Sequence, residues 1–339
     1  MDQSVGQMDA GGFWGNHVAS WADCGSRRVF LWHSKEEDIS AMKRIKQILS
    51  VTAYNFKKWH KNPRIFITFI LAFILCFLLS DKAVQFAKMY ETSMQIVEPF
   101  VWTFGDANSI LLSSLLLLLL FADMPFIDSS TPFYLMRIDR KTWVLGQGVY
   151  VMLTTSIYLV FILISTSLVC MTQSFAGNMW SETAAILGYS GIGQDIALPA
   201  LVKTLEMSQP YDCMLTIFLL MLLYTLVMAL IMLLMNLKKG YMGGVISVFA
   251  FSLYGFLLNP ETIKTIFRLP DALMYKANVA VGWLSPLNHA TYHMHNFGYD
   301  LLPRLWQTYL IFGILILLIF FLLLREIRKF SFNFLETEG

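Results

Sequence analysis

The chain has 339 residues, of which 56% are hydrophobic and 14% are charged, and its mean hydropathy is +0.57. Soluble domains carry about 25% charged residues, so this composition excludes an ordinary soluble protein. The net charge of +2 is too small to indicate a nucleic-acid partner. The four cysteines have no spacing typical of a zinc site or a disulfide framework: Cys24, Cys76, Cys170 and Cys213.

Residues 1–41 have no continuous apolar segment, so they do not form a signal peptide. We expect this N-terminal extension to be disordered or to follow a mis-assigned start. Residues 34–38 read Ser-Lys-Glu-Glu-Asp, and codons for Lys-Glu-Glu can spell a purine-rich ribosome-binding sequence. We therefore hypothesise that Met42 is the natural start. The alternative is a genuine cytoplasmic tail.

Residues 42–62 alternate apolar and basic positions at helical spacing. Ile45, Ile48, Leu49, Thr52, Ala53 and Phe56 recur on one face, and lysines occupy the other face. This pattern predicts an amphipathic helix lying in the membrane interface, where Phe56 and Trp59 favour the headgroup zone. The alternative is a solvated juxtamembrane helix. Pro63 then turns the chain into the first apolar segment.

Six apolar segments within residues 63–335 are each predicted to cross the membrane as a helix, since about 20 apolar residues span the hydrocarbon core. The fold class is therefore an all-α integral membrane protein, because helices satisfy their backbone within one segment in lipid. The six segments are residues 63–80, 101–121, 143–171, 213–237, 241–258 and 305–324.

Lys and Arg residues fall mainly on every second connection. They cluster at residues 43–64, at 137–141, at 238–239 and at 325–329. Short loops rich in Lys and Arg stay in the cytoplasm. We therefore expect a multi-pass membrane protein with both termini in the cytoplasm.

The connections differ in length between the two sides. The longest cytoplasmic loop joining two spans covers residues 122–142, where Ser130 or Thr131 could cap a short helix. Residues 236–240 form a tight turn on the same side. Three outer segments, 81–100, 172–212 and 259–304, are expected to form interfacial or re-entrant helices that close the outer mouth.

Catalytic motifs are weak in this sequence. No phosphate-binding G-x-x-x-x-G-K-[ST] motif occurs, so if this protein drives transport with ATP, the ATPase is another chain. On a helix, His289 and His293 would share a face at a spacing typical of metal ligands. Ser285, His289 and Asp300 are residue types that could form the catalytic triad of a hydrolase. Neither pattern is specific. Ion-coupled carriers usually need charged side chains buried near the middle of a span, and the interiors of the predicted spans hold almost none.

The order of these parts resembles the permease subunit of bacterial ABC-2 type ABC transporters. The resemblance covers residues 42–335, and it depends on the basic helix NFKKWHKNPR, the loop LLFADMPFIDSSTPFYLMRIDRKTWVLGQ and the segment SPLNHATYHMHNFGYDLLPRLWQTYLIF. It implies that residues 42–62 form the elbow helix. It also implies an exporter of a hydrophobic or amphipathic substrate, with a second permease subunit and a separate ATPase subunit that binds the ATP.

The resemblance further implies that the loop 122–142 contains a coupling helix that docks into the ATPase. The candidate coupling residues are Asp128, Ser130, Pro132, Phe133, Tyr134, Arg137 and Arg140. Two alternatives remain open at this point. One is a membrane-embedded enzyme that modifies lipids through the outer histidines, and the other is a non-catalytic scaffold or secondary carrier.

Overall fold

The computed structural model describes residues 41–126, 131, 136–195, 198, 200–298 and 300–330. These parts of the chain are mostly helical, as predicted. One exception is a pair of two-residue strands, β1 (Met94–Gln95) and β2 (Ser174–Phe175), which pair in parallel. Among the described helices, four are long and apolar enough to cross a membrane, or up to five if a bent pair counts as one span.

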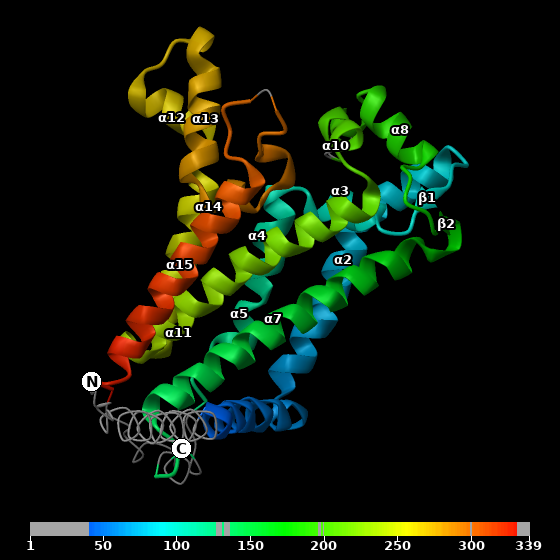
Figure 1. The fold of residues 1–339 in the computed structure, drawn as a ribbon. Helices are drawn as coiled ribbons and strands as arrows, with labels where there is room; N and C mark the ends of the chain where they lie inside the picture. The colour runs from blue at the N-terminus through cyan, green and yellow to red at the C-terminus, as the bar shows by residue number, and fades with distance from the viewer. Residues whose placement is uncertain are drawn as a thin grey trace, which may run out of the picture.

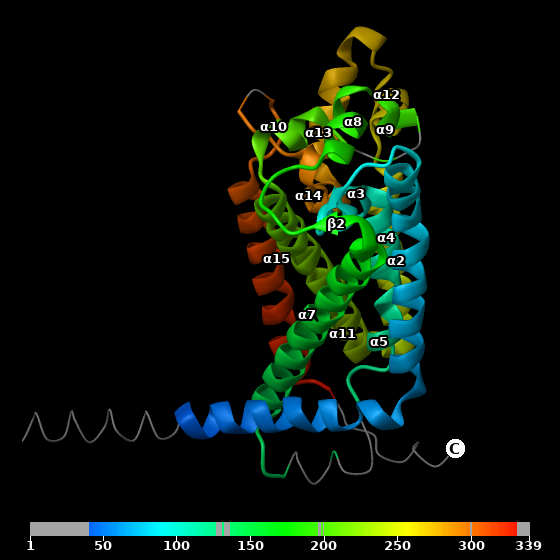
Figure 2. The ribbon, with the colours of Figure 1, turned by 90° about the vertical axis from the view of Figure 1, so that its right-hand side faces the viewer.

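The helix over residues 41–57 lies across one end of the molecule, at a large angle to the long helices (Figure 2). We call this end the basal end and the opposite end the distal end. Val51, Thr52 and Asn55 are buried, and Val51 packs so closely on Gly146 that a Cβ there would come within 2.7 Å of it. Met42, Ile45 and Leu49 remain exposed. The amphipathic helix therefore uses one strip against the bundle and leaves a second, apolar strip uncovered.

The first long helix, α2 (Pro63–Met89), begins where the short helix η1 (Trp59–Lys61) ends. The side chain of Asn62 accepts a hydrogen bond from the backbone N–H of Arg64, and Pro63 occupies the first helical position. Both residue types favour a helix start. α2 packs on α7 (Arg140–Cys170), so these two helices form one side of the bundle (Figure 1).

The second predicted span, residues 101–121, is broken in the structure. It divides into α3 (Glu98–Phe104), α4 (Ala107–Leu116) and α5 (Leu118–Phe121). α3 makes an angle of 91° with the α4–α5 pair. Asp106 starts α4 by accepting hydrogen bonds from the backbone N–H groups of Asn108 and Ser109. This cap explains the break, because its extended backbone cannot continue α3.

The longest helix, α11 (Pro210–Leu257), folds back on itself at Gly240, whose φ of 74° and ψ of 178° are not helical. The rings of Tyr224 and Phe251 lie 5.9 Å apart, although a straight helix would separate them by about 40 Å. α11 is therefore a hairpin, with a first arm over 210–239 and a second arm over 241–257. The predicted turn at residues 236–240 is located at its last residue, Gly240, because residues 236–239 still belong to the first arm.

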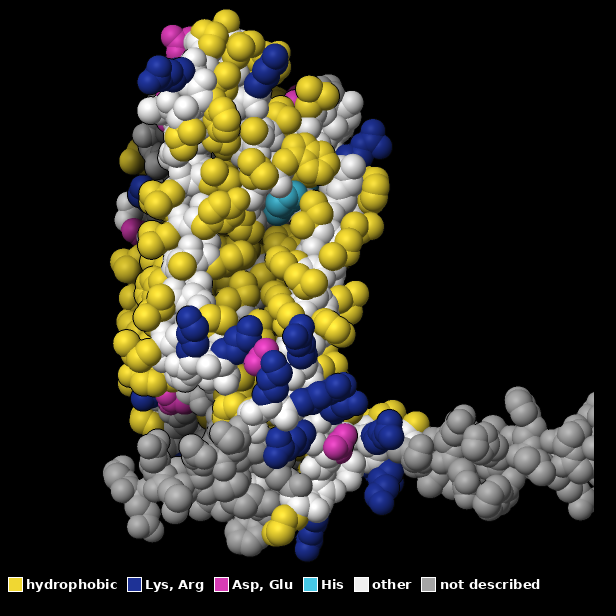
Figure 3. All heavy atoms as spheres, turned by 90° about the vertical axis from the view of Figure 1, so that its left-hand side faces the viewer, with side chains coloured by type: hydrophobic (Ala, Val, Ile, Leu, Met, Phe, Trp, Pro, Cys, Tyr) yellow, Lys and Arg dark blue, Asp and Glu magenta, His cyan; other side chains and the backbone are white. Residues whose placement is uncertain are grey.

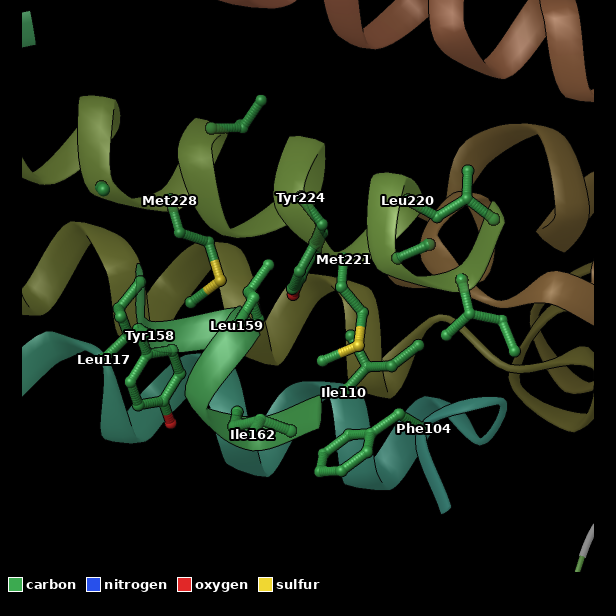
Figure 4. Packing of buried hydrophobic residues seen from close by; sticks show 14 of the residues in the cluster. Phe104, Ile110, Leu117, Tyr158, Leu159, Ile162, Leu220, Met221, Tyr224 and Met228 are labelled. Atoms are coloured by element: carbon green, nitrogen blue, oxygen red, sulfur yellow. The ribbon is translucent and has the colours of Figure 1, made fainter. Parts of the chain in front are cut away.

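The core of the bundle lies between α4, α7 and the first arm of α11 (Figure 4). Tyr158 and Ile162 of α7 meet Ile110 of α4, while Met221 and Tyr224 of α11 close the cluster. The Tyr158 hydroxyl donates a hydrogen bond to the Ser113 carbonyl over 2.8 Å. The last long helix, α15 (Leu305–Glu326), packs along α11.

Short helices cover the distal end, in agreement with the outer segments expected from the sequence. After η2 (Met171–Gln173) come α8 (Glu182–Tyr189), α9 (Ile192–Asp195) and α10 (Val202–Met207). A second group joins α11 to α15 and includes a projecting pair, α12 and α13 (Figure 1). Its members are α12 (Pro260–Phe267), η3 (Asp271–Leu273), α13 (Met274–Leu284), α14 (Pro286–Ala290) and η4 (Tyr292–Met294).

The distal layer is joined to the bundle by a buried carboxylate. Glu98, at the start of α3, has no exposed surface and accepts hydrogen bonds from the backbone N–H and the hydroxyl of Ser181 over 2.7 and 2.6 Å. Ser181 in turn caps α8. A buried charged group is tolerated when it is hydrogen-bonded in this way, so Glu98 fixes α8 relative to α3.

The two arms of the α11 hairpin can pack closely because residue 244 is a glycine. A Cβ at Gly244 would lie 1.8 Å from Oδ1 of Asn236 and 2.9 Å from the Met232 carbonyl. We expect Gly244→Ala to destabilise the protein by about 1–3 kcal/mol, as overpacking does, and to lower its Tm in detergent. Gly313→Ala is the matched control, because nothing lies within 4 Å of a Cβ in the middle of α15. It should leave Tm unchanged or raise it, since Ala favours helix. Equal Tm values for the two variants would contradict the packing of the hairpin.

Candidate functional site

The loop predicted to couple this chain to a partner leaves the bundle at the basal end. The structure describes both ends of this loop, residues 122–126 and 136–142, and Thr131 between them. Of the candidate coupling residues, Arg137 and Arg140 are described. The other five lie outside the described residues: Asp128, Ser130, Pro132, Phe133 and Tyr134.

The first end of the loop is held by α2. The carboxylate of Asp123 forms an ion pair with the guanidinium of Arg64, at the start of α2. Each side chain is about half exposed, at 46% and 53%. Exposed pairs of this kind contribute about 0.2–1 kcal/mol. The pair therefore contributes little to stability, but it fixes the direction in which the loop leaves α5.

The same end of the loop is also held by the α11 hairpin. Asn236 is 6% exposed, and its side-chain amide donates to the carbonyls of Ala122 and Met124 over 3.1 and 2.5 Å. These carbonyls follow the last turn of α5, where the helix itself leaves acceptors without partners. The Asn236 side chain has room because Gly244 faces it. One carboxamide therefore joins the loop to both arms of the hairpin.

The second end of the loop is held by two other elements. Nε2 of Gln47, on the amphipathic helix, lies 3.4 Å from the carbonyl of Arg137 and donates to it. Arg140, where the predicted loop overlaps the first residue of α7, donates from Nη1 to the carbonyl of Phe330, beyond α15, over 3.1 Å. The Arg137 side chain is exposed. The described ends of the loop thus contact the amphipathic helix, α2, α11 and the segment that follows α15.

A cavity of about 570 Å³ opens beside this loop. It lies between the first end of the loop, the turn of the α11 hairpin and the end of α15, and Lys238 and Glu326 approach to 3.8 Å at its edge. Asp123 and Lys329 also line it. The lining therefore carries both signs of charge.

Sequence reasoning identified the loop but missed the residues that hold it. Asn236 interrupts the run Met-Leu-Leu-Met-Asn-Leu, and a lone amide in an apolar segment is costly unless it is bonded. This cost could have identified Asn236 from the sequence as a residue that needs hydrogen-bond partners. Gln47 and Arg64 carried no comparable signal, because polar residues are ordinary in a basic juxtamembrane segment.

The distal histidines form a separate hydrogen-bonded cluster. The Thr308 hydroxyl lies 2.9 Å from Nδ1 of His289 and 2.9 Å from Nε2 of His295. The other ring nitrogens face the carbonyls of Trp283 and Tyr292, each at 3.1 Å. With both rings neutral, the single Thr308 proton can satisfy one of the two nitrogens that face it.

The structure does not bring together the residues considered for a metal site or for a hydrolase triad. His289 lies on α14, which ends at Ala290, so His289 and His293 do not share a helical face. Within the described residues, no group of three His, Cys, Asp or Glu side chains could hold a metal ion. Ser285 donates to the Gly255 carbonyl, while Asp300 pairs with Lys203 over 2.5 Å. The three side chains that a hydrolase would need thus have three different partners.

The distal cluster predicts a pH dependence of stability. Burial lowers the pKa of His295 to about 4 and also lowers the pKa of His289. A histidine in the unfolded chain titrates near 6.5, so protons bind preferentially to the unfolded state below that pH. The stabilisation is present above about pH 6.5 and is lost as the pH falls toward 4.

We expect the Tm in detergent to fall between pH 7.5 and pH 5.0, with a loss on the order of 2 kcal/mol from His295 alone. In the His295→Gln variant, which cannot titrate, the fall should be smaller. The same fall in the variant and the natural chain would show that this histidine does not control the pH response.

Comparison with known proteins assigns no family to this chain. No family model, no curated protein and no solved structure matches it. The functional conclusions therefore depend on its own residues and their arrangement.

Proposed function

We propose that this chain is the transmembrane permease subunit of an ATP-driven exporter of the ABC-2 type. The observation that carries the proposal is the loop 122–142, because its described ends contact four separate elements of the bundle. A partner that displaces this loop would move α2, α11, the amphipathic helix and the segment after α15 together. Such a connection suits a subunit that receives force from a separate ATPase.

The arrangement of the helices supports a topology of six crossings. α2, the α4–α5 pair, α7, the two arms of α11 and α15 run between the basal and distal ends (Figures 1 and 2). Lys and Arg side chains gather around the basal end on the face shown in Figure 3. Because short basic segments stay in the cytoplasm, we assign the basal end and both termini to the cytoplasmic side of the bacterial plasma membrane.

A hollow face supports a hydrophobic or amphipathic substrate. Figure 3 shows an apolar depression on the side of the molecule where α15 and the second arm of α11 lie. Both elements expose large apolar side chains, among them Ile246, Phe249, Leu310 and Ile314. In our proposal a second permease subunit faces this surface, and the substrate passes between the two subunits.

Docking of the ATPase provides the test. Arg137→Glu with Arg140→Glu should release the partner ATPase, because charge reversal at a docking surface opposes the complementary partner. Phe133→Asp alone should do the same, because it places a charge where an apolar side chain would be buried against the partner. The measurement is the amount of ATPase that co-purifies with the detergent-solubilised chain. Lys43→Glu with Arg44→Glu is the matched control, since it makes the same change in charge on the amphipathic helix.

We expect the loop variants to lose most of the ATPase and the control to retain it, with all variants keeping the natural Tm within a few degrees. Unchanged co-purification in the loop variants would exclude this loop as the docking site. If no ATPase co-purifies even with the natural chain, the proposed function is wrong.

A further inference from the structure

A second basal cavity lies where the amphipathic helix turns into α2. Its volume is about 680 Å³. The cavity lies between the last turn of the amphipathic helix, η1, the first turn of α2 and Tyr150 of α7. Asn236, Arg137 and Arg140 do not line it, and its lining includes Phe126, which belongs to the first described end of the loop 122–142. Nothing in the proposed transport cycle requires it.

The rim of this cavity is strongly basic. Lys57, Lys58, His60 and Lys61 all line it, and none of the described residues that line it carries a carboxylate. The ammonium of Lys58 lies 4.6 Å from the centre of the Tyr54 ring, which keeps this lysine at the wall of the cavity. Lys57 and Lys61 are exposed at its rim. Three lysines within five residues around a concave surface favour an anion.

The floor of the cavity is aromatic and rigid. Nε1 of Trp59 donates to the Tyr150 hydroxyl over 2.9 Å, and the Phe56 ring lies 5.0 Å from both the Trp59 and the Tyr150 rings. Beneath them, the buried Asn55 amide donates to Oε1 of Gln147 over 2.8 Å. These contacts hold the amphipathic helix on α7. A ligand therefore meets a preformed site and loses little free energy in ordering it.

An apolar surface continues from the cavity along α2. Phe66, Ile67 and Ile70 follow the cavity residue Ile65 and are 59%, 49% and 60% exposed. On the amphipathic helix, Ile45 and Leu49 are also more than half exposed. Exposed apolar side chains next to a basic, aromatic pocket match the boundary between lipid headgroups and acyl chains.

We propose that this cavity binds the phosphate-bearing headgroup of an anionic phospholipid, with the phosphate between Lys57, Lys58 and Lys61 and the acyl chains along α2. The lysines alone would accept any phosphate. The apolar surface of α2 is what favours a lipid, since a free phosphate makes no use of it. The bound lipid fixes the depth of the amphipathic helix in the membrane interface.

Binding of phosphatidylglycerol to the full chain in detergent tests the proposal. The chain would be titrated with phosphatidylglycerol, with phosphatidylcholine and with inorganic phosphate, and native mass spectrometry would measure the bound fraction. The variant Lys57→Gln, Lys58→Gln, Lys61→Gln removes three charges from the cavity. The matched control Lys43→Gln, Arg44→Gln, Lys46→Gln removes three charges from the same amphipathic helix away from the cavity.

We expect one tightly bound phosphatidylglycerol per chain, with an affinity lowered about tenfold or more in the cavity variant and by less than about twofold in the control. Equal losses in both variants would show diffuse attraction to basic residues and overturn the site. The proposal is also overturned if phosphatidylcholine binds as tightly as phosphatidylglycerol, or if inorganic phosphate alone binds as tightly as the lipid.

Tyr150→Phe, which keeps every charge but removes the acceptor of the Trp59 bond, should weaken binding modestly and thereby locate the lipid at this floor. None of these outcomes depends on whether an ATPase binds the loop.

Discussion

The reversal of α11 at Gly240 is the constraint on which the rest of the structure depends. A positive φ is easily adopted by glycine, and here it turns an apolar helix of 48 residues into two arms. Those arms pack against α15, α14, α7 and α4. Asn236 and Gly244 then fit together at the basal end of the hairpin. Without this close contact, the amide that holds the loop 122–142 would have no fixed position.

The hairpin also explains why the basal end can act as one unit. Asn236 joins it to the loop through two carbonyls, and Lys238 approaches Glu326 of α15. The loop is held in addition by Arg64 and Gln47. Each contact alone is worth little, yet together they connect the beginning, middle and end of the chain. In the proposed exporter, these contacts would carry a movement of the ATPase into the helices.

The lipid site places a second constraint at the same end of the molecule. The amphipathic helix is anchored to α7 through Asn55 and Trp59, and a bound headgroup would hold it at the membrane surface. In the proposed exporter, the loop would move against a helix whose depth is fixed. The loop contacts the amphipathic helix at Gln47, and it also reaches the lipid cavity through Phe126, so the two sites adjoin one another.

Much of the helical architecture could be predicted from the sequence, because long apolar runs and basic loops report directly on burial in lipid. The turn at residues 236–240 and the short distal helices were predictable for the same reason. The bend before α4 was not, because the cap that Asp106 provides depends on two backbone amides and leaves no trace in hydropathy. The burial of Glu98 against Ser181 was also missed, since its partner is 83 positions away in the sequence.

The candidate site was predictable as a region and not as a set of contacts. Two arginines and five acidic, small or aromatic residues defined the loop, but its anchors Gln47, Arg64 and Asn236 belong to other elements. Pairing between distant segments depends on how the helices pack. A single sequence does not specify that packing.

The sidedness of the two ends is tested most directly by cysteine labelling in intact cells. The described native cysteines, Cys76, Cys170 and Cys213, are buried, and Cys24 would be replaced by Ser. Met136→Cys in the basal loop and Ile266→Cys on α12 place single thiols at positions that are 75% and 67% exposed. A membrane-impermeant maleimide should label residue 266 in intact cells and residue 136 after permeabilisation alone. Labelling of residue 136 in intact cells would place the coupling loop outside, where no ATPase can drive it, and would contradict the account.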